Sequence, residues 1–210
     1  MRSMAHPPLD PETEFGVPSI DDVGKVREIA GHVRAIIEAL GLDPSDPNLQ
    51  ETDERVAKMY LEMFHGLSEG AEPRVTVFPN EERYTAMVME KDIPFYSMCA
   101  HHFVPFYGHV HVAYIPNESI VGLSKMARIV EFYARRPQLQ ERLTEQIAGF
   151  MAEKLDPQGV MVVVEARHLC VEMRGVKKPG ALTVTSAIRG IFNTQSVREE
   201  FLNLLDRSGS

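Results

Sequence analysis

Two short stretches of the sequence contain the residue types that bind transition metals and transfer protons. In the first, SMCAHHFVPF, Cys99 precedes the adjacent His101 and His102. In the second, ARHLCVEM, His168 lies two positions before Cys170, and the chain has 2 cysteines in all. Thiolate and imidazole are ligands that zinc prefers, so the two stretches predict one shared metal site where the fold brings them together.

Five such side chains exceed what one tetrahedral zinc can bind. Cys99, His102 and Cys170 form a three-ligand set, which leaves the fourth position to water, as in catalytic zinc sites. His101 and His168 would then flank the metal as proton-transfer groups, because imidazole titrates near neutral pH. Spacing alone leaves an alternative open, since buried cysteines are often only small hydrophobic side chains.

The apolar periodicity places both stretches on strands. Period-two patterns cover TAMVME, IPFYSMC and YGHVHVAYI, and later VMVVVEARHLCVEM and LTVTSAIRGIF. His168 and Cys170 are therefore predicted to share one face of a strand, because alternate side chains point the same way. His109 and His111 alternate along a strand without a cysteine partner, and we interpret them as structural.

Helical spacing predicts two helices before the strands begin. Ser19 is expected to cap the first helix, and Gly41 to end it. Thr52 is expected to cap the second, which runs to about Phe64. Both are interpreted as packing helices.

Three further helices are predicted among and after the strands. One begins near Ser124, and the next begins after Pro137 and ends before Pro157. Ser196 and Glu199 have the spacing of a capping box for the last helix.

The order of helices and grouped strands predicts an α+β fold with a mostly antiparallel sheet. Residues 1–18 are polar and proline-rich, and we expect a disordered lead-in there. Residues 19–80 would form an N-terminal helical extension, and residues 81–206 the catalytic domain.

Composition narrows the class of protein. The chain has 210 residues, 44% hydrophobic and 25% charged, which is typical of a globular domain. It has no spanning apolar run and no apolar signal-peptide segment, and with two cysteines we expect a cytoplasmic location. A net charge of −8 argues against nucleic acid or a membrane surface as partner.

Basic side chains nevertheless gather at a helix start and after the second metal-binding stretch. They are Lys125 and Arg128 beside Ser124, then Arg174, Lys177 and Lys178. A helix start favours anions, so cations near a metal site indicate a phosphorylated substrate. A solvated surface is the equal alternative from these residues alone.

Several motifs together resemble the GTP cyclohydrolase I family. They are CAHHFVPFYGHVHVAYIP, VGLSKMARIVEFYARRPQLQERLTEQI and ARHLCVEMRGVKKPGALTVTS, and the likeness covers residues 51–205. The resemblance implies a tunnelling fold (T-fold), with two helices on one face of an antiparallel sheet. It further implies an oligomeric β-barrel, a homodecamer with interfacial active sites, and one Zn²⁺ per subunit.

The resemblance also implies a reaction. GTP and water would give 7,8-dihydroneopterin triphosphate and formate, the first step of folate or tetrahydrobiopterin biosynthesis. The zinc ligands would be Cys99, His102 and Cys170, and the proton-transfer residues His101 and His168. The implied substrate contacts, for guanine and for the triphosphate, are Glu141, Gln140, Ser124, Lys125, Arg128, Arg174, Arg55 and Lys58.

Two positions depart from the family pattern. Ala100 stands where the family usually has glutamate, and Asp53 where it usually has proline. The first leaves open a related GTP-ring hydrolase with a different product. A catalytically silent nucleotide-binding paralogue is the alternative from another class, although the retained histidines and Glu141 argue against it.

Overall fold

The computed structural model describes residues 22–206, so the predicted lead-in and the Ser19 cap lie outside the described residues. The chain folds into two compact units, one ending at Glu62 and the other beginning at Met63. None of the described helices is long and apolar enough to cross a membrane.

The first unit is built on two helices, as predicted. α1 (Asp22–Ala39) ends before Gly41, whose φ of +78° is the left-handed conformation expected after a helix. α2 (Thr52–Met63) includes Thr52 as its first residue, so the predicted Thr52 cap is wrong by one residue, and the helix ends one residue earlier than predicted. Arg34 of α1 and Asp53 of α2 form an ion pair at 3.2 Å, which ties the helices together.

The second unit contains a five-stranded sheet that is antiparallel except at one edge, as the sequence predicted. The strand order is β5 (Pro137–Gln138), β2 (Val88–Cys99), β3 (Pro105–Ile115), β6 (Gly159–His168) and β7 (Leu182–Gly190). Only the short β5 runs parallel to its neighbour, β2. A separate two-stranded sheet pairs β1 (Val77–Pro79) with β4 (Ser119–Val121).

β2 joins two segments that the sequence predicted as separate strands. Its register shifts between Glu90 and Ile93, and Asp92 has a φ of +60° there. The N–H of Asp92 donates a hydrogen bond to Nδ1 of the buried His111, at 3.1 Å. Burial and this hydrogen bond agree with the interpretation of His111 as a structural residue.

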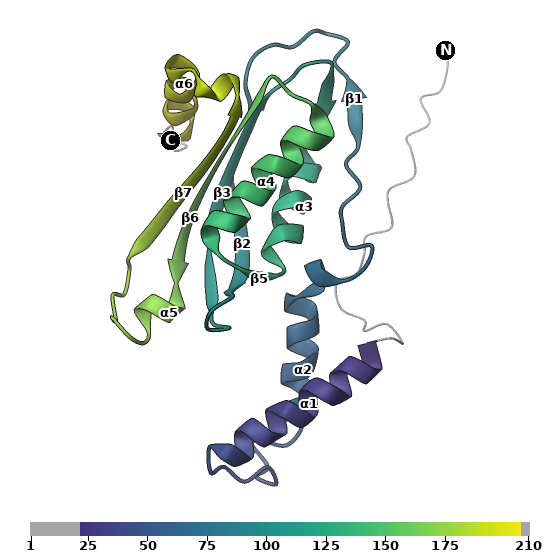
Figure 1. Ribbon diagram of the computed structural model, residues 1–210, viewed down its shortest axis with the longest axis vertical. Coiled ribbons are helices and arrows are strands. Elements are labelled where there is room, and N and C mark those ends of the chain that lie inside the picture. The colour runs from purple at the N-terminus through teal and green to yellow at the C-terminus, as the bar shows by residue number, and fades with distance from the viewer. Residues whose placement is uncertain (1–21, 207–210) are drawn as a thin grey trace. The chain divides into compact units, whose positions relative to one another are not determined.

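Two helices cover one face of the sheet (Figure 1). They are α3 (Leu123–Ala134) and α4 (Gln140–Leu155), close to their predicted bounds. Their buried side chains pack on alternate residues of β3 and β6, including Val110, Val112 and Val162. This alternation is what puts the apolar face of each strand under the helices.

The opposite face of the sheet is covered at one end by a short 3₁₀ turn (Ile191–Asn193) and α6 (Gln195–Asp206). Phe192 and Phe201 are fully buried there. The predicted capping box is wrong, because α6 begins one residue before Ser196. Glu199 instead accepts a hydrogen bond from the side chain of Gln195, at 2.8 Å.

Candidate metal centre and proton-transfer site

The first metal-binding stretch is a tight turn at the end of β2. Cys99 is the last residue of the strand, and its carbonyl accepts hydrogen bonds from the N–H groups of His102 and Phe103, at 3.2 and 2.8 Å. These bonds fold the chain back on itself. As a result, Nδ1 of His102 lies 3.7 Å from Sγ of Cys99.

Cys170 is not on a strand, so the predicted shared strand face with His168 is wrong. β6 ends at His168, and the chain continues as a single helical turn, α5 (Leu169–Glu172). The last residues of β6 with strand partners are Arg167 and His168, so no neighbouring strand extends the pairing. A β-type pattern without a pairing partner does not form a strand.

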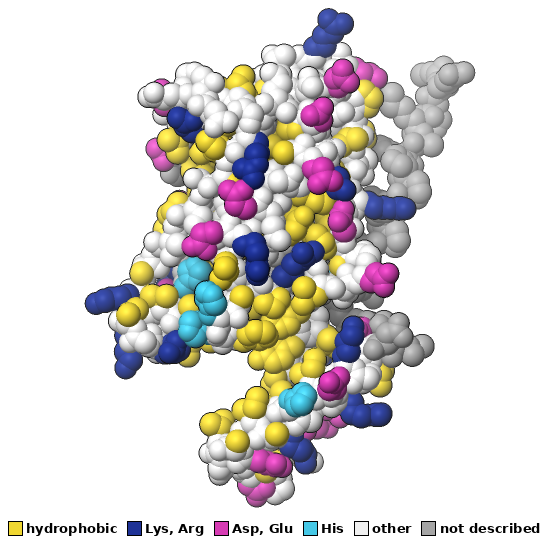
Figure 2. Space-filling model, viewed as in Figure 1, with side chains coloured by type: hydrophobic (Ala, Val, Ile, Leu, Met, Phe, Trp, Pro, Cys, Tyr) yellow, Lys and Arg dark blue, Asp and Glu magenta, His cyan; other side chains and the backbone are white. Residues whose placement is uncertain are grey.

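The helical turn nevertheless brings the second cysteine to the first stretch. The ligand atoms of Cys99, His102 and Cys170 all lie within 4.8 Å of one another. Cys99 is buried, Cys170 half-buried and His102 exposed, so the cluster opens to solvent on one side. Figure 2 shows histidine side chains gathered near the α5 end of the sheet, with Lys and Arg side chains around them.

The donor set fits zinc. Two thiolates and one imidazole are zinc ligands, and a tetrahedral ion places bound sulfur and nitrogen ~3.6 Å apart. The measured Sγ–Nδ1 distance of 3.7 Å is close to that value. Without a cation, burial and the neighbouring Cys99 raise the pKa of the Cys170 thiol, while Arg174 opposes the rise. A bound cation would stabilise both sulfurs as thiolates and so offset the unfavourable effect of each on the ionisation of the other.

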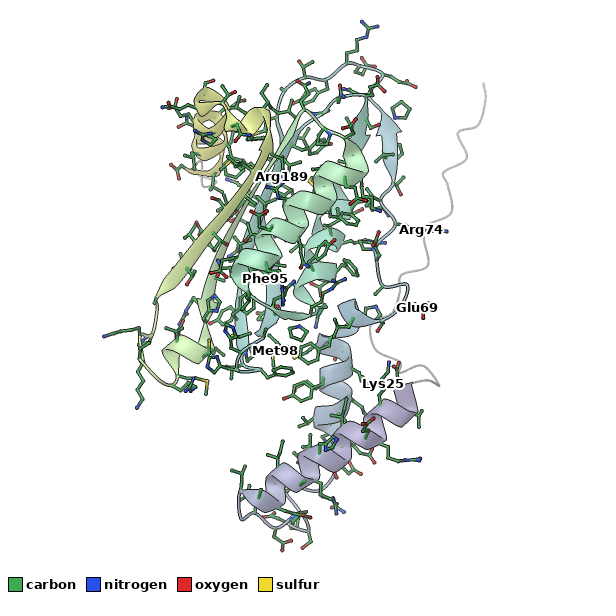
Figure 3. The ribbon with its side chains drawn as sticks, in the orientation of Figure 1. Lys25, Glu69, Arg74, Phe95, Met98 and Arg189 are labelled. Carbon is green, nitrogen blue, oxygen red and sulfur yellow. The ribbon has the colours of Figure 1, made fainter. Side chains whose placement is uncertain are left out.

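His168 is held in one orientation beside the cluster. Its ring stacks on Phe106, with centroids 4.6 Å apart and planes at 2°. Its Nε2 lies 2.7 Å from Oε1 of Gln140. Phe95 of β2, which is labelled in Figure 3, belongs to the same buried cluster as Phe106, meets it edge-on at 5.7 Å and completes the aromatic support.

Gln140 is 2% exposed, and its contacts determine which ring nitrogen of neutral His168 carries the proton. The Gln140 amide nitrogen donates to the carbonyl groups of Val164 and Thr183, both at 3.0 Å. Its oxygen therefore faces His168, and an amide oxygen only accepts. Neutral His168 carries its proton on Nε2, which leaves Nδ1 with the lone pair.

Two threonines brace this amide, and sequence reasoning did not find them. Thr185 of β7 accepts from the Gln140 nitrogen at 3.2 Å, and Thr144 of α4 lies 2.7 Å from the Thr185 hydroxyl. The Thr144 hydroxyl also donates to the carbonyl of Gln140, at 2.7 Å. Spacing gave no signal for them, because they meet only when β7 packs under α4.

Glu141 and the remaining histidine lie around this core. Glu141 is exposed in the first turn of α4, and its charge raises the pKa of His168 against the larger lowering caused by burial. His101 is exposed, and its ring meets that of His102 edge-on at 6.1 Å.

The predicted triphosphate contacts, together with the neighbouring Ser124, lie in three places. Ser124, Lys125 and Arg128 lie in the first two turns of α3, and Arg174 follows α5. Arg55 and Lys58 belong to the first unit, where they form ion pairs with Glu51 and Glu54 at 3.1 and 3.2 Å. Of these six residues only Lys125 is partly buried, and the other five are exposed.

Comparison with known proteins agrees with this geometry. The profile of the family described as GTP cyclohydrolase I matches residues 29–206. The chain belongs to the GTP cyclohydrolase I family. It is therefore related to a family of enzymes, as the resemblance in its motifs predicted.

Individual relatives are similar over nearly their whole length. A protein of Carboxydothermus hydrogenoformans named GTP cyclohydrolase 1 is 55% identical over 175 residues, which are 82% of this chain and 91% of that one. Proteins of the same name from a Geobacillus species (strain WCH70) and from Bacillus subtilis are 58% and 54% identical. They cover 82% and 86% of this chain, and the matches span 93% and 95% of their own lengths.

Proposed function

We propose that this chain is a zinc-dependent GTP cyclohydrolase I. It would open the imidazole ring of GTP with water, release formate and form 7,8-dihydroneopterin triphosphate. The observation that carries the proposal is the convergence of Cys99, His102 and Cys170 beside the oriented His168, in a chain of this family. Three ligands and an adjacent general acid–base group are the parts that a hydrolytic zinc site requires.

Cys99, His102 and Cys170 would hold the ion. When bound, zinc supplies a Lewis acid that lowers the pKa of coordinated water toward about 7. The cluster's exposed side, at His102, is where substrate and water have access.

The histidines would move the protons. Gln140 keeps the Nε2 proton of His168 in place, so Nδ1 is the atom that exchanges a proton with N7 of the guanine ring during opening. The exposed His101 would be the second proton-transfer group. Stacking on Phe106 restrains the His168 ring, which reduces the entropy lost on reaching the reactive geometry.

Substrate recognition would use the surrounding charges. The Glu141 carboxylate can accept hydrogen bonds from the guanine N–H groups, and Gln140 and Ser124 would be neighbouring contacts. The triphosphate would be bound by the basic set Lys125, Arg128, Arg174, Arg55 and Lys58, because a polyanion is stabilised by several cations at once.

We further propose a tunnelling fold in which residues 81–206 form the catalytic domain and the sheets of several subunits close a barrel. The active sites of a homodecamer would lie at subunit interfaces, with Arg55 and Lys58 reaching the phosphates of an adjacent subunit. Two free thiols at the metal centre fit a reducing, cytoplasmic setting. The product would enter folate or tetrahydrobiopterin synthesis.

The test is incubation of zinc-loaded protein with GTP, following formate release and the product mass. His168→Ala should lower the rate of formate release about 10²–10⁴-fold, the usual contribution of a general acid–base group. His109→Ala is the matched control, since His109 is an exposed histidine of β3. A ring-opened formamide as final product would replace this proposal with the related hydrolase, and absence of any turnover would favour the silent paralogue.

A further inference from the structure

An ion pair closes the short segment that carries both His168 and Cys170. Arg167 precedes the segment, and Glu172 ends it. Nε of Arg167 donates to one carboxylate oxygen of Glu172 at 2.7 Å, and Nη2 donates to the other at 2.5 Å. We call this two-point contact the Arg167–Glu172 clasp. Such bidentate pairs fix direction as well as distance.

The clasp is better supported than the exposed Lys58–Glu54 ion pair, which has a similar sequence spacing. The Glu172 side chain is 7% exposed, whereas both partners of the Lys58–Glu54 pair are more than half exposed. The Arg167 guanidinium lies 5.9 Å from the ring centroid of Tyr107, which stacks on Tyr96 at 5.7 Å. Burial of the Glu172 carboxylate and the ring contact of the Arg167 guanidinium, whose side chain is 42% exposed, make this pair more than a weak surface contact.

The backbone of the segment has few restraints of its own. α5 is one turn long, closed by the hydrogen bond from Met173 N–H to the Leu169 carbonyl at 3.0 Å. Lys178 N–H adds a bond to the carbonyl of Val171, at 3.1 Å. An isolated turn is not stable in water, so side chains must contribute to its orientation.

We propose that Arg167 and Glu172 are positioning residues of the metal centre. The clasp ties the end of β6 to the end of α5 and thereby aims Cys170 Sγ at Cys99 and His102. Neither clasp residue is a ligand, and neither is among the residues assigned to substrate. The inference rests on the proposed metal centre, but not on the identity of the reaction product.

Loss of the clasp should weaken metal binding without abolishing the fold. Residues that orient ligands from outside the coordination sphere typically change metal affinity about 10–100-fold. Two backbone bonds remain in the segment, so we expect the lower end, about tenfold.

The experiment compares zinc affinity in four variants of the full chain. Glu172→Gln and Arg167→Met each break the clasp, and the double variant Arg167→Glu with Glu172→Arg reverses it. Glu145→Gln is the control, because it breaks another Arg–Glu ion pair of the same unit, Arg189–Glu145 at 2.5 Å, which joins β7 to α4 away from the metal-binding stretches. The readouts are competition for zinc with a chromogenic chelator and the visible absorption of the cobalt(II)-substituted protein.

The expected result is an approximately tenfold rise of the zinc Kd and an altered cobalt spectrum in both single variants. Glu145→Gln should keep the wild-type values, and the reversed pair should recover most of the loss. Wild-type affinity in both single variants, an equal loss in Glu145→Gln, or no recovery in the reversed pair would overturn the proposal. Because no step uses GTP, wild-type protein that binds zinc but releases no formate would refute the proposed function alone.

Discussion

Gln140 is buried, and every polar atom of its side chain is engaged with His168, with two backbone carbonyls or with Thr185. The structure thus supports a part in orienting His168, while its contact with substrate stays a prediction. An amide is suited to this task because it can accept from a ring N–H without adding charge.

Replacing Gln140 would distinguish a role in orienting His168 from a role in binding substrate. Gln140→Leu removes the acceptor for Nε2 and should lower kcat about tenfold or more, with a smaller change in KM, because ring orientation matters most in proton transfer. Gln146→Leu is the control, since Gln146 lies on the same helix and bonds to Gln138 instead. Steady-state formate release is the measurement. A raised KM with unchanged kcat would assign Gln140 to substrate binding instead.

His111 makes stability depend on pH. Burial lowers its pKa, against the opposing effects of the Asp92 and Glu165 carboxylates, while His109 and Lys91 lower it further. In the unfolded chain the His111 imidazole has its ordinary pKa near 6.5, so it is protonated at a higher pH than in the folded protein. The free energy of unfolding therefore falls as pH drops below about 6.5. The slope is at most about 1.4 kcal/mol per pH unit.

Urea unfolding between pH 7.5 and 5.5 would test this. His111→Asn keeps an acceptor for the Asp92 N–H but cannot be protonated in this range, so its stability should fall less steeply with acidification. Equal slopes in the two proteins would show that other groups cause the acid sensitivity.

At the scale of elements, one glycine allows β3 and β6 to approach closely beside His168. A Cβ on Gly108 would lie 1.9 Å from the carbonyl oxygen of Glu165 and 2.8 Å from Cα of Ala166. Both contacts are with backbone, which cannot move aside as a side chain can. The pairing of Phe106 with His168 is two residues away in the same ladder.

Gly108→Ala should therefore destabilise the second unit by about 1–3 kcal/mol, the usual cost of forcing extra volume into packed structure. Gly149→Ala in α4 is the control, since its Cβ would have no neighbour within 4 Å and alanine favours helix. Denaturant midpoints give the comparison. Equal midpoints for wild type and Gly108→Ala would mean that β3 and β6 can move apart enough for a Cβ without lowering the stability of the second unit.

The elements that the sequence predicted well are those with long, regular patterns. β3, β6, α3 and α4 have full apolar periodicity, and the two cysteine stretches converge as expected. Cys170 was misplaced because strand pairing, not residue pattern, ends β6. The Ser196 cap was misplaced by two residues, because a cap there requires a helix from Val197 and α6 begins at Gln195. Errors of this size are usual at helix ends.

The supporting residues of the site could not be predicted from the sequence. Thr144, Thr185, Arg167 and Glu172 have ordinary types at ordinary spacings, and each acts through a contact made only in the folded unit. Ligand-type residues can be found from composition, whereas the residues that orient them depend on register.

At the scale of the molecule, metal removal should lower thermal stability. A ligand at about 100 times its Kd stabilises the folded state by about 2.7 kcal/mol. For a domain of about 150 residues each kcal/mol shifts Tm by about 2–4 °C, so a chelator should lower Tm by about 5–10 °C. The comparison requires equal protein concentration, because assembly also affects Tm.

Cys170→Ala provides the control for this measurement. It removes one ligand, so zinc and chelator should give nearly the same Tm. A chelator shift of wild-type size in Cys170→Ala would place the stabilising ion elsewhere.

The arrangement of the cluster also orders events during folding. Cys99 and His102 are made before β3, whereas Cys170 follows β6, and only the pairing of β3 with both strands brings the two stretches together. Such distant contacts form late, because the loop between them must first be closed. A chain still emerging from the ribosome has just two of the three ligands, so tight loading with zinc can follow only once the centre of the sheet has formed.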